Sequence, residues 1–234
     1  MNLVNYRLEG AVAHITMDDG KVNVLSSAML AALGAALDRA ESDGAGAVLL
    51  AGREKAFSAG FDLTELMAGG ASTSGLLRAG FEISSRLLAF PAPVVAACRG
   101  HAIAMGFFVL QSVDYRLAAR GVPGKLVANE VANGLIVPRA ALEICRARLA
   151  PSHFGRVTLL SEVYSVENAV EAGIVDRVVS NEELDGAASV LANQLALLNR
   201  PAHAETKRRA RADLLARLAE GIELDLADFV LRAK

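Results

Sequence analysis

Residues 56–63 read Ala-Phe-Ser-Ala-Gly-Phe-Asp-Leu, and residues 100–106 read Gly-His-Ala-Ile-Ala-Met-Gly. Each stretch follows a short apolar run, Ala47–Ala51 before the first and Val94–Cys98 before the second. Because neither run alternates with polar residues, both are predicted to be strands covered on two faces. The small residues that follow let the backbone turn sharply and approach a ligand. Two such loops on one sheet can aim backbone N–H groups at one oxygen that acquires negative charge.

Outside these loops, the order of helix and strand patterns predicts an α/β fold. Asn2–Leu8 and Ala11–Met17 alternate like the strands of a hairpin. Helix and strand patterns then follow in turn, which implies crossover connections and a largely parallel sheet. The Gly- and Ser-rich stretch Met67–Gly75 is predicted to be a mobile loop. Beyond Pro138 the chain is predicted to be mainly helical, with one more strand, Val175–Val179. The predicted helices are Ala141–Leu149, Ser165–Gly173, Leu184–Leu198 and Ala202–Ala233, the last with an apolar stripe from Leu214 to Phe229.

The composition predicts a globular protein of the cytoplasm. The 234 residues carry a net charge of −2 with 53% hydrophobic and 21% charged residues, which excludes disorder and disfavours a nucleic-acid partner. Cys98 and Cys145 are too few for a disulfide framework or a zinc cluster, as expected in a reducing compartment. Met1–Gly10 lacks the pattern of a secretory signal, and no apolar run reaches the ~18 residues of a membrane span.

Several common chemistries lack their sequence signatures. No Gly-x-Gly-x-x-Gly follows a strand, and no Gly-x-Ser-x-Gly is present. Gly124-Lys125 does not make a phosphate-binding loop, because Ala119 stands where its first glycine is needed. The four histidines do not have metal-ligand spacing, so no metal is expected, and His101 is predicted to be structural. Lys207–Arg209 with Arg211 is predicted to be a solvated helix face rather than an anion site.

Phe57–Leu63 is followed about forty residues later by Gly100–Gly106 and Asp114. This pattern closely resembles that of the enoyl-CoA hydratase/isomerase family, which has the crotonase fold. The resemblance includes Gly20–Leu25 and runs to Val175–Val179, so it covers most of the chain. It implies a ClpP/crotonase-like core of repeated ββα units over residues 1–180. It also implies a C-terminal helical region over residues 181–234 that mediates trimerisation within one continuous domain, as a homotrimer or a dimer of trimers.

The resemblance also implies the substrate and how it is held. Relatives bind an acyl-CoA thioester, with coenzyme A as part of the substrate rather than a cofactor, and hold its carbonyl oxygen between two peptide N–H groups. By position these belong to Phe61 and Met105, with Gly106 as the alternative to Met105, because Ala104-Met105-Gly106 departs from the usual glycines. The remaining residues expected to contact the thioester or its CoA moiety are Lys21, Val22, Ala59, Gly60, Asp62, Leu63, Thr64, Gly106 and Phe108.

The reaction depends on the acid–base groups. Hydratases of this family use two glutamates, and the position of the first is Phe108 here, while the second falls at Glu130. One carboxylate is sufficient to move a proton during isomerisation, so Glu130 is the expected catalytic base, with a pKa raised by an apolar surrounding of Val127, Val131, Leu135 and Phe108. The leading hypothesis is an enzyme of fatty-acid metabolism that isomerises 3-enoyl-CoA to 2-enoyl-CoA. An enoyl-CoA hydratase, other crotonase-fold thioester chemistry and a non-catalytic acyl-CoA binder are the alternatives.

Overall fold

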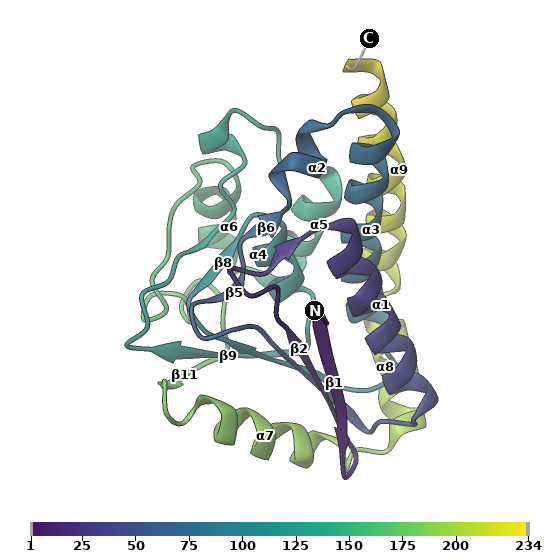
Figure 1. Ribbon diagram of the computed structural model, residues 1–234, viewed down its shortest axis with the longest axis vertical. Coiled ribbons are helices and arrows are strands. Elements are labelled where there is room, and N and C mark those ends of the chain that lie inside the picture. Colours follow the sequence, from purple (N-terminus) through teal and green to yellow (C-terminus); the bar gives the residue numbers. More distant parts are fainter. Residues whose placement is uncertain (1, 233–234) are drawn as a thin grey trace.

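The structure is a computed structural model that describes residues 2–232, with side chains as far as Asp228. Its main sheet has the strand order β1-β2-β4-β7-β9-β11 (Figure 1). The strands are β1 (Val4–Glu9), β2 (Val12–Met17), β4 (Ala47–Ala51), β7 (Val94–Cys98), β9 (Tyr115–Arg120) and β11 (Arg177–Ser180). β1 and β2 are antiparallel, whereas every later neighbour is parallel. The predicted hairpin and parallel sheet are thus confirmed.

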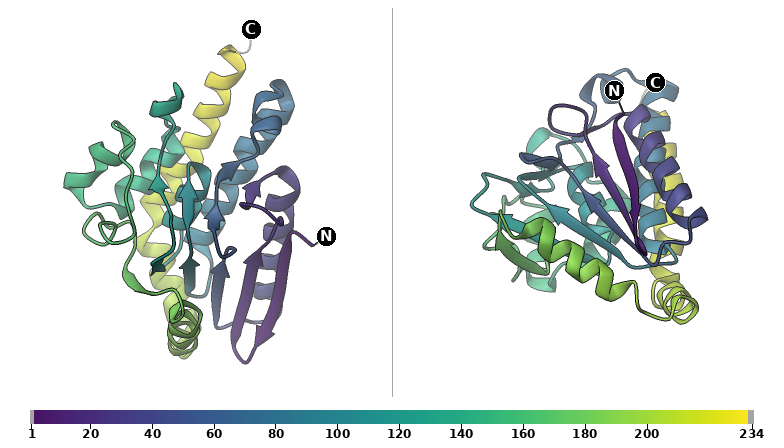
Figure 2. Two further views of the ribbon diagram at one scale, coloured as in Figure 1. Left: turned by 60° about the vertical axis from the view of Figure 1, so that its left-hand side comes forward. Right: turned by 60° about the horizontal axis from the view of Figure 1, so that its bottom comes forward.

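Helices cover both faces of this sheet, as the absence of polar alternation in β4 predicts. α1 (Ser27–Ser42) and α3 (Gly70–Ala89) share one core with Val48 and Leu50. α7 (Leu184–Leu195) lies beneath the opposite face and shares a second core with Ala47 and Leu49 (Figures 1 and 2). Successive strand residues point to opposite faces, so both sets are buried. The large sheet is therefore a rigid platform between two apolar layers.

Two small parallel sheets stand above the platform and hold its loops together. One contains β10 (Leu126–Val127), β8 (His101–Ile103) and β5 (Ala56–Ser58), and the other pairs β3 (Val24–Leu25) with β6 (Gly60–Phe61). β5 and β6 follow the main-sheet strand β4, and β8 follows β7. The segments that continue beyond neighbouring strands of the main sheet are consequently pinned to one another by backbone hydrogen bonds.

The second half of the chain is mainly helical. Its elements are α4 (Met105–Gln111), a 3-10 turn (Val131–Asn133), α5 (Arg139–Arg148), α6 (Pro151–Thr158), α8 (Arg200–Ala210) and α9 (Ala212–Arg232). α9 packs along α5 and α3 (Figure 2, left). Leu214, Leu218 and Ile222 of its apolar stripe are buried in this packing. The stripe's last predicted member, Phe229, lies beyond the described side chains.

Three predicted segments were wrong. The expected loop Met67–Gly75 is helical from Gly70 onward, since Leu76 is buried and the Thr73 hydroxyl ties the helix start to the carbonyl of Leu66 at 2.9 Å. Ser165–Gly173 forms successive turns rather than a helix. The long helix predicted over Ala202–Ala233 is divided between α8 and α9 at Arg211.

Within the described range, no helix combines the length and apolar character needed to cross a bilayer.

Candidate active site

The turn between β5 and β6 requires glycine at position 60. Gly60 has a φ of +91°, and a Cβ there would lie 2.9 Å from the carbonyl oxygen of Ile103 and 3.4 Å from the backbone nitrogen of Met105. Such contacts with backbone leave no room for a side chain, so only glycine lets the two loops approach this closely. The structure therefore brings Phe61 beside Ala104-Met105-Gly106, as expected.

The second loop turns abruptly into α4. Ala104 has φ +49° and ψ −122°, a conformation that is costly for a residue with a Cβ. Its N–H donates to the carbonyl of Val127 at 2.9 Å, and its own carbonyl accepts the N–H of Phe108 at 3.1 Å. Met105 and Gly106 are the first two residues of α4, where N–H groups have no partner within the helix. Both predicted alternatives for the second N–H donor thus lie in the first turn of this helix.

The Gly106 position also shows why the two loops have a fixed separation. A Cβ at Gly106 would lie 2.5 Å from the carbonyl oxygen of Ser58. At Gly80 in α3, a Cβ would lie 2.5 Å from the Phe61 ring and 3.4 Å from the terminal methyl of Met105. The side chains of Phe61 and Met105 therefore both pack against Gly80 of α3.

The Glu130 side chain is buried, with 8% of the residue exposed, three residues after β10. Its Oε2 has no hydrogen-bond partner among the described residues. Burial raises the pKa of Glu130 to about 7. The pKa of the Cys145 thiol on α5 is also raised, first by burial and then by the nearby negative charge of Glu130. β10 pairs with β8, and Val127 of β10 accepts the N–H of Ala104. Glu130 therefore lies in the segment that follows β10, the strand next to the second loop.

The surroundings of Glu130 differ in part from the expectation. Val127 and Phe108 are buried, as expected for an apolar environment. Val131 and Leu135 are instead about half exposed, because the 3-10 turn that begins after Glu130 lies at the surface. Desolvation of the carboxyl group therefore comes from the core side of the turn rather than from the turn itself.

Phe108 lies in an aromatic cluster. Its ring stacks on Phe81 at a centroid distance of 6.4 Å and meets Phe107 edge-on at 5.9 Å. Only 1% of Phe108 is exposed. The position that the resemblance assigns to the first glutamate of hydratases is thus an apolar part of the core and supplies no acid or base.

Three polar residues, none of them predicted to have this role, hold the first loop in place. Asn23 is fully buried with a φ of +55°, and its side-chain amide donates to the carbonyls of Met17 and Phe57 at 3.0 and 3.2 Å. The Asp19 carboxylate accepts the N–H of Asn23 at 2.9 Å, and the Ser58 hydroxyl donates to the Asn23 carbonyl at 2.7 Å. An asparagine within Gly20–Leu25 was the available signal, because asparagine tolerates the left-handed conformation of a turn.

The residues expected to contact CoA divide between the interior and the rim of the site. Ala59 is half-buried, and its N–H donates to the carbonyl of Val22 at 3.0 Å. Asp62 caps α2 (Leu63–Met67) by accepting the N–H groups of Thr64 and Glu65 at 2.8 and 3.1 Å. The side chains exposed at the rim are Lys21, Val22, Leu63 and Thr64.

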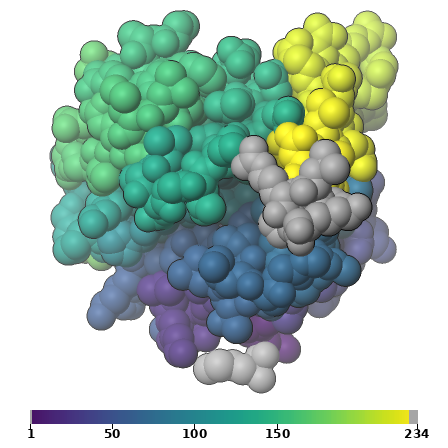
Figure 3. Space-filling model, turned by 90° about the horizontal axis from the view of Figure 1, so that it is seen from above, coloured from purple at the N-terminus to yellow at the C-terminus, as the bar shows by residue number. Residues whose placement is uncertain are grey.

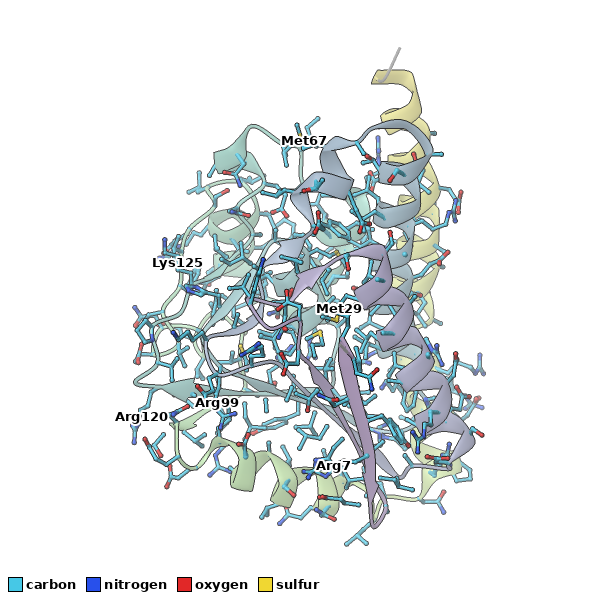
Figure 4. The ribbon with its side chains drawn as sticks, in the orientation of Figure 1. Arg7, Met29, Met67, Arg99, Arg120 and Lys125 are labelled. Carbon is cyan, nitrogen blue, oxygen red and sulfur yellow. The ribbon has the colours of Figure 1, made fainter. Side chains whose placement is uncertain are left out.

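The rim borders a depression of the surface. Figure 3 shows a hollow between the blue segment that includes α2 and the teal segment opposite it. Met67, at the end of α2, lies in the upper part of the molecule, with 81% of the residue exposed (Figure 4).

Other acidic and basic side chains of the chain have structural partners. Glu65 accepts from Ser27 and Glu143 from Arg217, while the His101 ring accepts the N–H of Lys125 at 3.1 Å. The prediction for the basic run was wrong at Lys207, which is buried and paired with a carboxylate. No three His, Cys, Asp or Glu side chains between residues 2 and 228 lie close enough together to hold a metal ion.

Comparisons with known proteins agree with this geometry. The family model described as enoyl-CoA hydratase/isomerase matches residues 7–231. The apo structure of an enoyl-CoA isomerase of Mycobacterium tuberculosis is 44% identical with a TM-score of 0.93, covering 97% of this chain and 99% of that one. Human mitochondrial Δ3-Δ2-enoyl-CoA isomerase is 27% identical with a TM-score of 0.93, covering 99% of this chain and 92% of that one.

A relative with a different named activity is similar over a shorter range. Carnitinyl-CoA dehydratase of Salmonella paratyphi A is 30% identical over 188 residues, which are 80% of this chain and 71% of the relative. The crotonase fold predicted from the two loops is confirmed by the structural neighbours. Since the family model spans nearly all of the sequence, the chain belongs to the enoyl-CoA hydratase/isomerase family.

Proposed function

We propose that this protein isomerises a 3-enoyl-CoA thioester to the conjugated 2-enoyl-CoA, with Glu130 as the only proton shuttle. The observation that carries the proposal is the pair formed by a buried Glu130 carboxyl, whose pKa is raised to about 7, and an apolar Phe108 at the other acid–base position. A carboxyl group of that pKa both accepts and returns a proton near neutral pH.

The reaction follows from these groups. The Glu130 carboxylate removes a proton from C2 of the acyl chain, and the electrons move onto the thioester oxygen as a dienolate. The N–H groups of Phe61 and Met105 stabilise that oxygen, and each such donor typically contributes ~10²–10³ in rate. The protonated Glu130 then delivers its proton to C4, which leaves the double bond between C2 and C3.

Met105 is preferred over Gly106 as the second donor. Its backbone nitrogen would lie 3.4 Å from a Cβ at Gly60, so it is next to the residue that precedes Phe61. A backbone donor does not depend on its side chain, and the departure from the family's glycines at this position is therefore compatible with function. The exposed rim residues Lys21, Val22, Leu63 and Thr64 are proposed to contact the CoA moiety.

The test compares Glu130→Gln with Glu143→Gln. Glu143 is also largely buried but is paired with Arg146 and Arg217, so its loss removes a carboxyl group without touching the proposed site. Conversion of a 3-enoyl-CoA is followed by the rise in absorbance of the conjugated thioester. We expect kcat to fall ~10²–10⁴-fold in Glu130→Gln and less than about twofold in Glu143→Gln. Acyl-CoA binding, measured by calorimetry, is expected to persist in both.

An enoyl-CoA hydratase is the second candidate, because relatives include a carnitinyl-CoA dehydratase. The same wild-type protein is assayed for water addition to a 2-enoyl-CoA. Hydration equal to or faster than isomerisation would favour this candidate, and undiminished isomerisation by Glu130→Gln would reject the proposed mechanism.

A further inference from the structure

A buried group of charges joins the start of β9 to α8, away from the candidate active site. The Asp114 carboxylate contacts Lys207 Nζ at 2.6 Å and Arg211 Nη2 at 2.8 Å, and it accepts the N–H of Val94 at 2.8 Å. Only 4% of the Lys207 side chain is exposed. Asp114 is therefore already satisfied by two cations and one backbone donor.

Further cations surround this pair. Arg116 contacts Asp176 at 2.7 Å, and Arg148 donates to the carbonyls of Val113 and Asp114 at 2.9 and 3.2 Å. The group thus has two more positive than negative charges, because four cations face two carboxylates. The cations are Arg116, Arg148, Lys207 and Arg211, and the carboxylates are Asp114 and Asp176. Burial lowers the pKa of Lys207 to about 8 and that of Arg148 to about 10, which shows that the carboxylates do not fully compensate.

Several nitrogen atoms of the group also lack partners. Nε and Nη1 of Arg116 and Nε of Arg148 are buried without a hydrogen-bond partner in the described part of the chain, as is Nε2 of His203. Buried donors in proteins are normally satisfied. The excess of positive charge in this group therefore favours an added anion, and His203 is the residue with an unpartnered nitrogen that also lines the groove described next.

A surface groove of about 490 Å³ opens onto the group along α8. One row of its lining is small, with Ala202, Thr206 and Ala210 four residues apart on the helix. The adjacent row, His203, Lys207 and Arg211, supplies the polar base together with the Asp114 carboxylate that pairs with Lys207 and Arg211. Leu198 and Asn199 complete the lining, so the groove combines a base of net positive charge with mostly aliphatic walls.

We propose that this groove binds an aliphatic monocarboxylate, with the carboxylate against Lys207 and Arg211 and the chain along Ala202, Thr206 and Ala210. Lys207 Nζ donates to Asp114 and to the carbonyl of Ala92, so one of its three protons remains for a ligand. Arg211 uses two of its five N–H groups, on Asp114 and on the carbonyl of Leu88. A charged oxygen supplies the missing negative charge, and a methylene chain covers the small residues of α8.

The test uses the purified full chain and sodium hexanoate as the probe. Binding is measured by calorimetry and by the rise in melting temperature at constant ionic strength, beside hexan-1-ol and inorganic phosphate. We expect saturable binding of hexanoate and at least about tenfold weaker binding of the alcohol, which lacks the charge, and of phosphate, which lacks the chain.

Three variants locate the site. Arg211→Gln and Ala202→Phe, which fills the groove without touching the ion pairs, are each expected to weaken hexanoate binding at least about tenfold. Arg209→Gln removes the same charge from the exposed side of α8, where Arg209 pairs with Glu205, and is expected to bind like the wild type. If Arg211→Gln fails to fold, Ala202→Phe decides alone.

The proposal is overturned if hexanoate does not bind, or if the alcohol or phosphate binds as tightly. It is also overturned if Ala202→Phe binds hexanoate as the wild type does. The site shares no residue with the candidate active site, so the outcome is independent of the enzyme assay.

Discussion

At the scale of single residues, the Glu130 carboxyl links the proposed catalysis to the stability of the fold. Its pKa is raised to about 7 by burial, with no compensating cation among the causes. Ionisation near neutral pH therefore happens in an environment that disfavours charge. Such a group can act as a base near neutral pH, and its ionisation lowers the free energy of unfolding.

The rate of isomerisation should depend on pH through this group. Only the carboxylate accepts the C2 proton, so kcat/KM is expected to fall about tenfold per pH unit below 7 and to level off above it. The measurement is a rate profile from pH 5.5 to 9, with acyl-CoA binding followed over the same range. A profile that is flat between pH 5.5 and 8 would assign proton removal to another group.

The stability of Glu130→Gln should exceed that of the wild type at high pH. The folded-state pKa lies above the unfolded value, so the wild type loses stability as the pH rises from about 4.5 to 7. At pH 8 the ionised carboxyl costs about 3 kcal/mol, a cost that neutral glutamine does not carry. Urea unfolding is expected to show a gain of this order at pH 8 that shrinks below about 1 kcal/mol at pH 5. A less stable variant at pH 8 would contradict this account.

At the scale of elements, the turn from β8 into α4 stores strain. Ala104 occupies φ +49°, ψ −122°, which costs a residue with a Cβ on the order of 1 kcal/mol or more. Ala104→Gly is expected to raise the free energy of unfolding by about 1 kcal/mol and to leave activity intact, because the Met105 N–H is unchanged.

The matched control for Ala104→Gly is Ala102→Gly in the adjoining strand β8. Ala102 is fully buried and has no positive φ, so glycine there should destabilise the protein. Chemical denaturation measures both variants. Equal destabilisation by the two substitutions would show that the turn is not strained.

Short-range patterns predicted the elements that depend on them. The runs Ala47–Ala51 and Val94–Cys98 are strands, as predicted, because apolar residues fill both faces. The same patterns predicted that two small-residue loops would meet, although Asn23, which holds the first loop, makes long-range bonds that no local pattern displays.

The missed features depend on tertiary contacts. The break between α8 and α9 has no proline or glycine, and Arg211 is fixed there by Asp114 and the carbonyl of Leu88. Lys207 was predicted to be solvated because charge runs usually are, yet its partner lies 93 residues earlier in the chain. Sequence periodicity does not contain such partners, so these positions were not predictable from local pattern.

At the scale of the whole molecule, the C-terminal helices are integral to the fold of the chain. Leu214, Leu218 and Ile222 pack in the same core as α1 and α3, so much of the apolar stripe on α9 is used within the chain. The trimer suggested by the family resemblance stays a prediction. Light scattering is expected to give three or six times the 24.5 kDa of one chain, and a monomer at micromolar concentration would contradict it.

The junction of the sheet with those helices is centred on Asp114. Its carboxylate binds the N–H of Val94 in β7 together with Lys207 and Arg211 at the end of α8, and only 18% of its side chain is exposed. Asp114→Asn leaves two buried cations without their carboxylate, so we expect a loss of about 3–5 kcal/mol in the free energy of unfolding.

Urea unfolding measures the loss in Asp114→Asn, and native-state hydrogen exchange shows where the protein opens. The amides of α8 are expected to exchange faster than those of α1, because α8 loses its attachment while the sheet keeps its two cores. Glu205→Gln is the control, since Glu205 pairs with the exposed Arg208 and Arg209 on the same helix and should change stability by less than about 1 kcal/mol. A comparably small effect of Asp114→Asn would mean that apolar packing alone holds the C-terminal helices to the sheet.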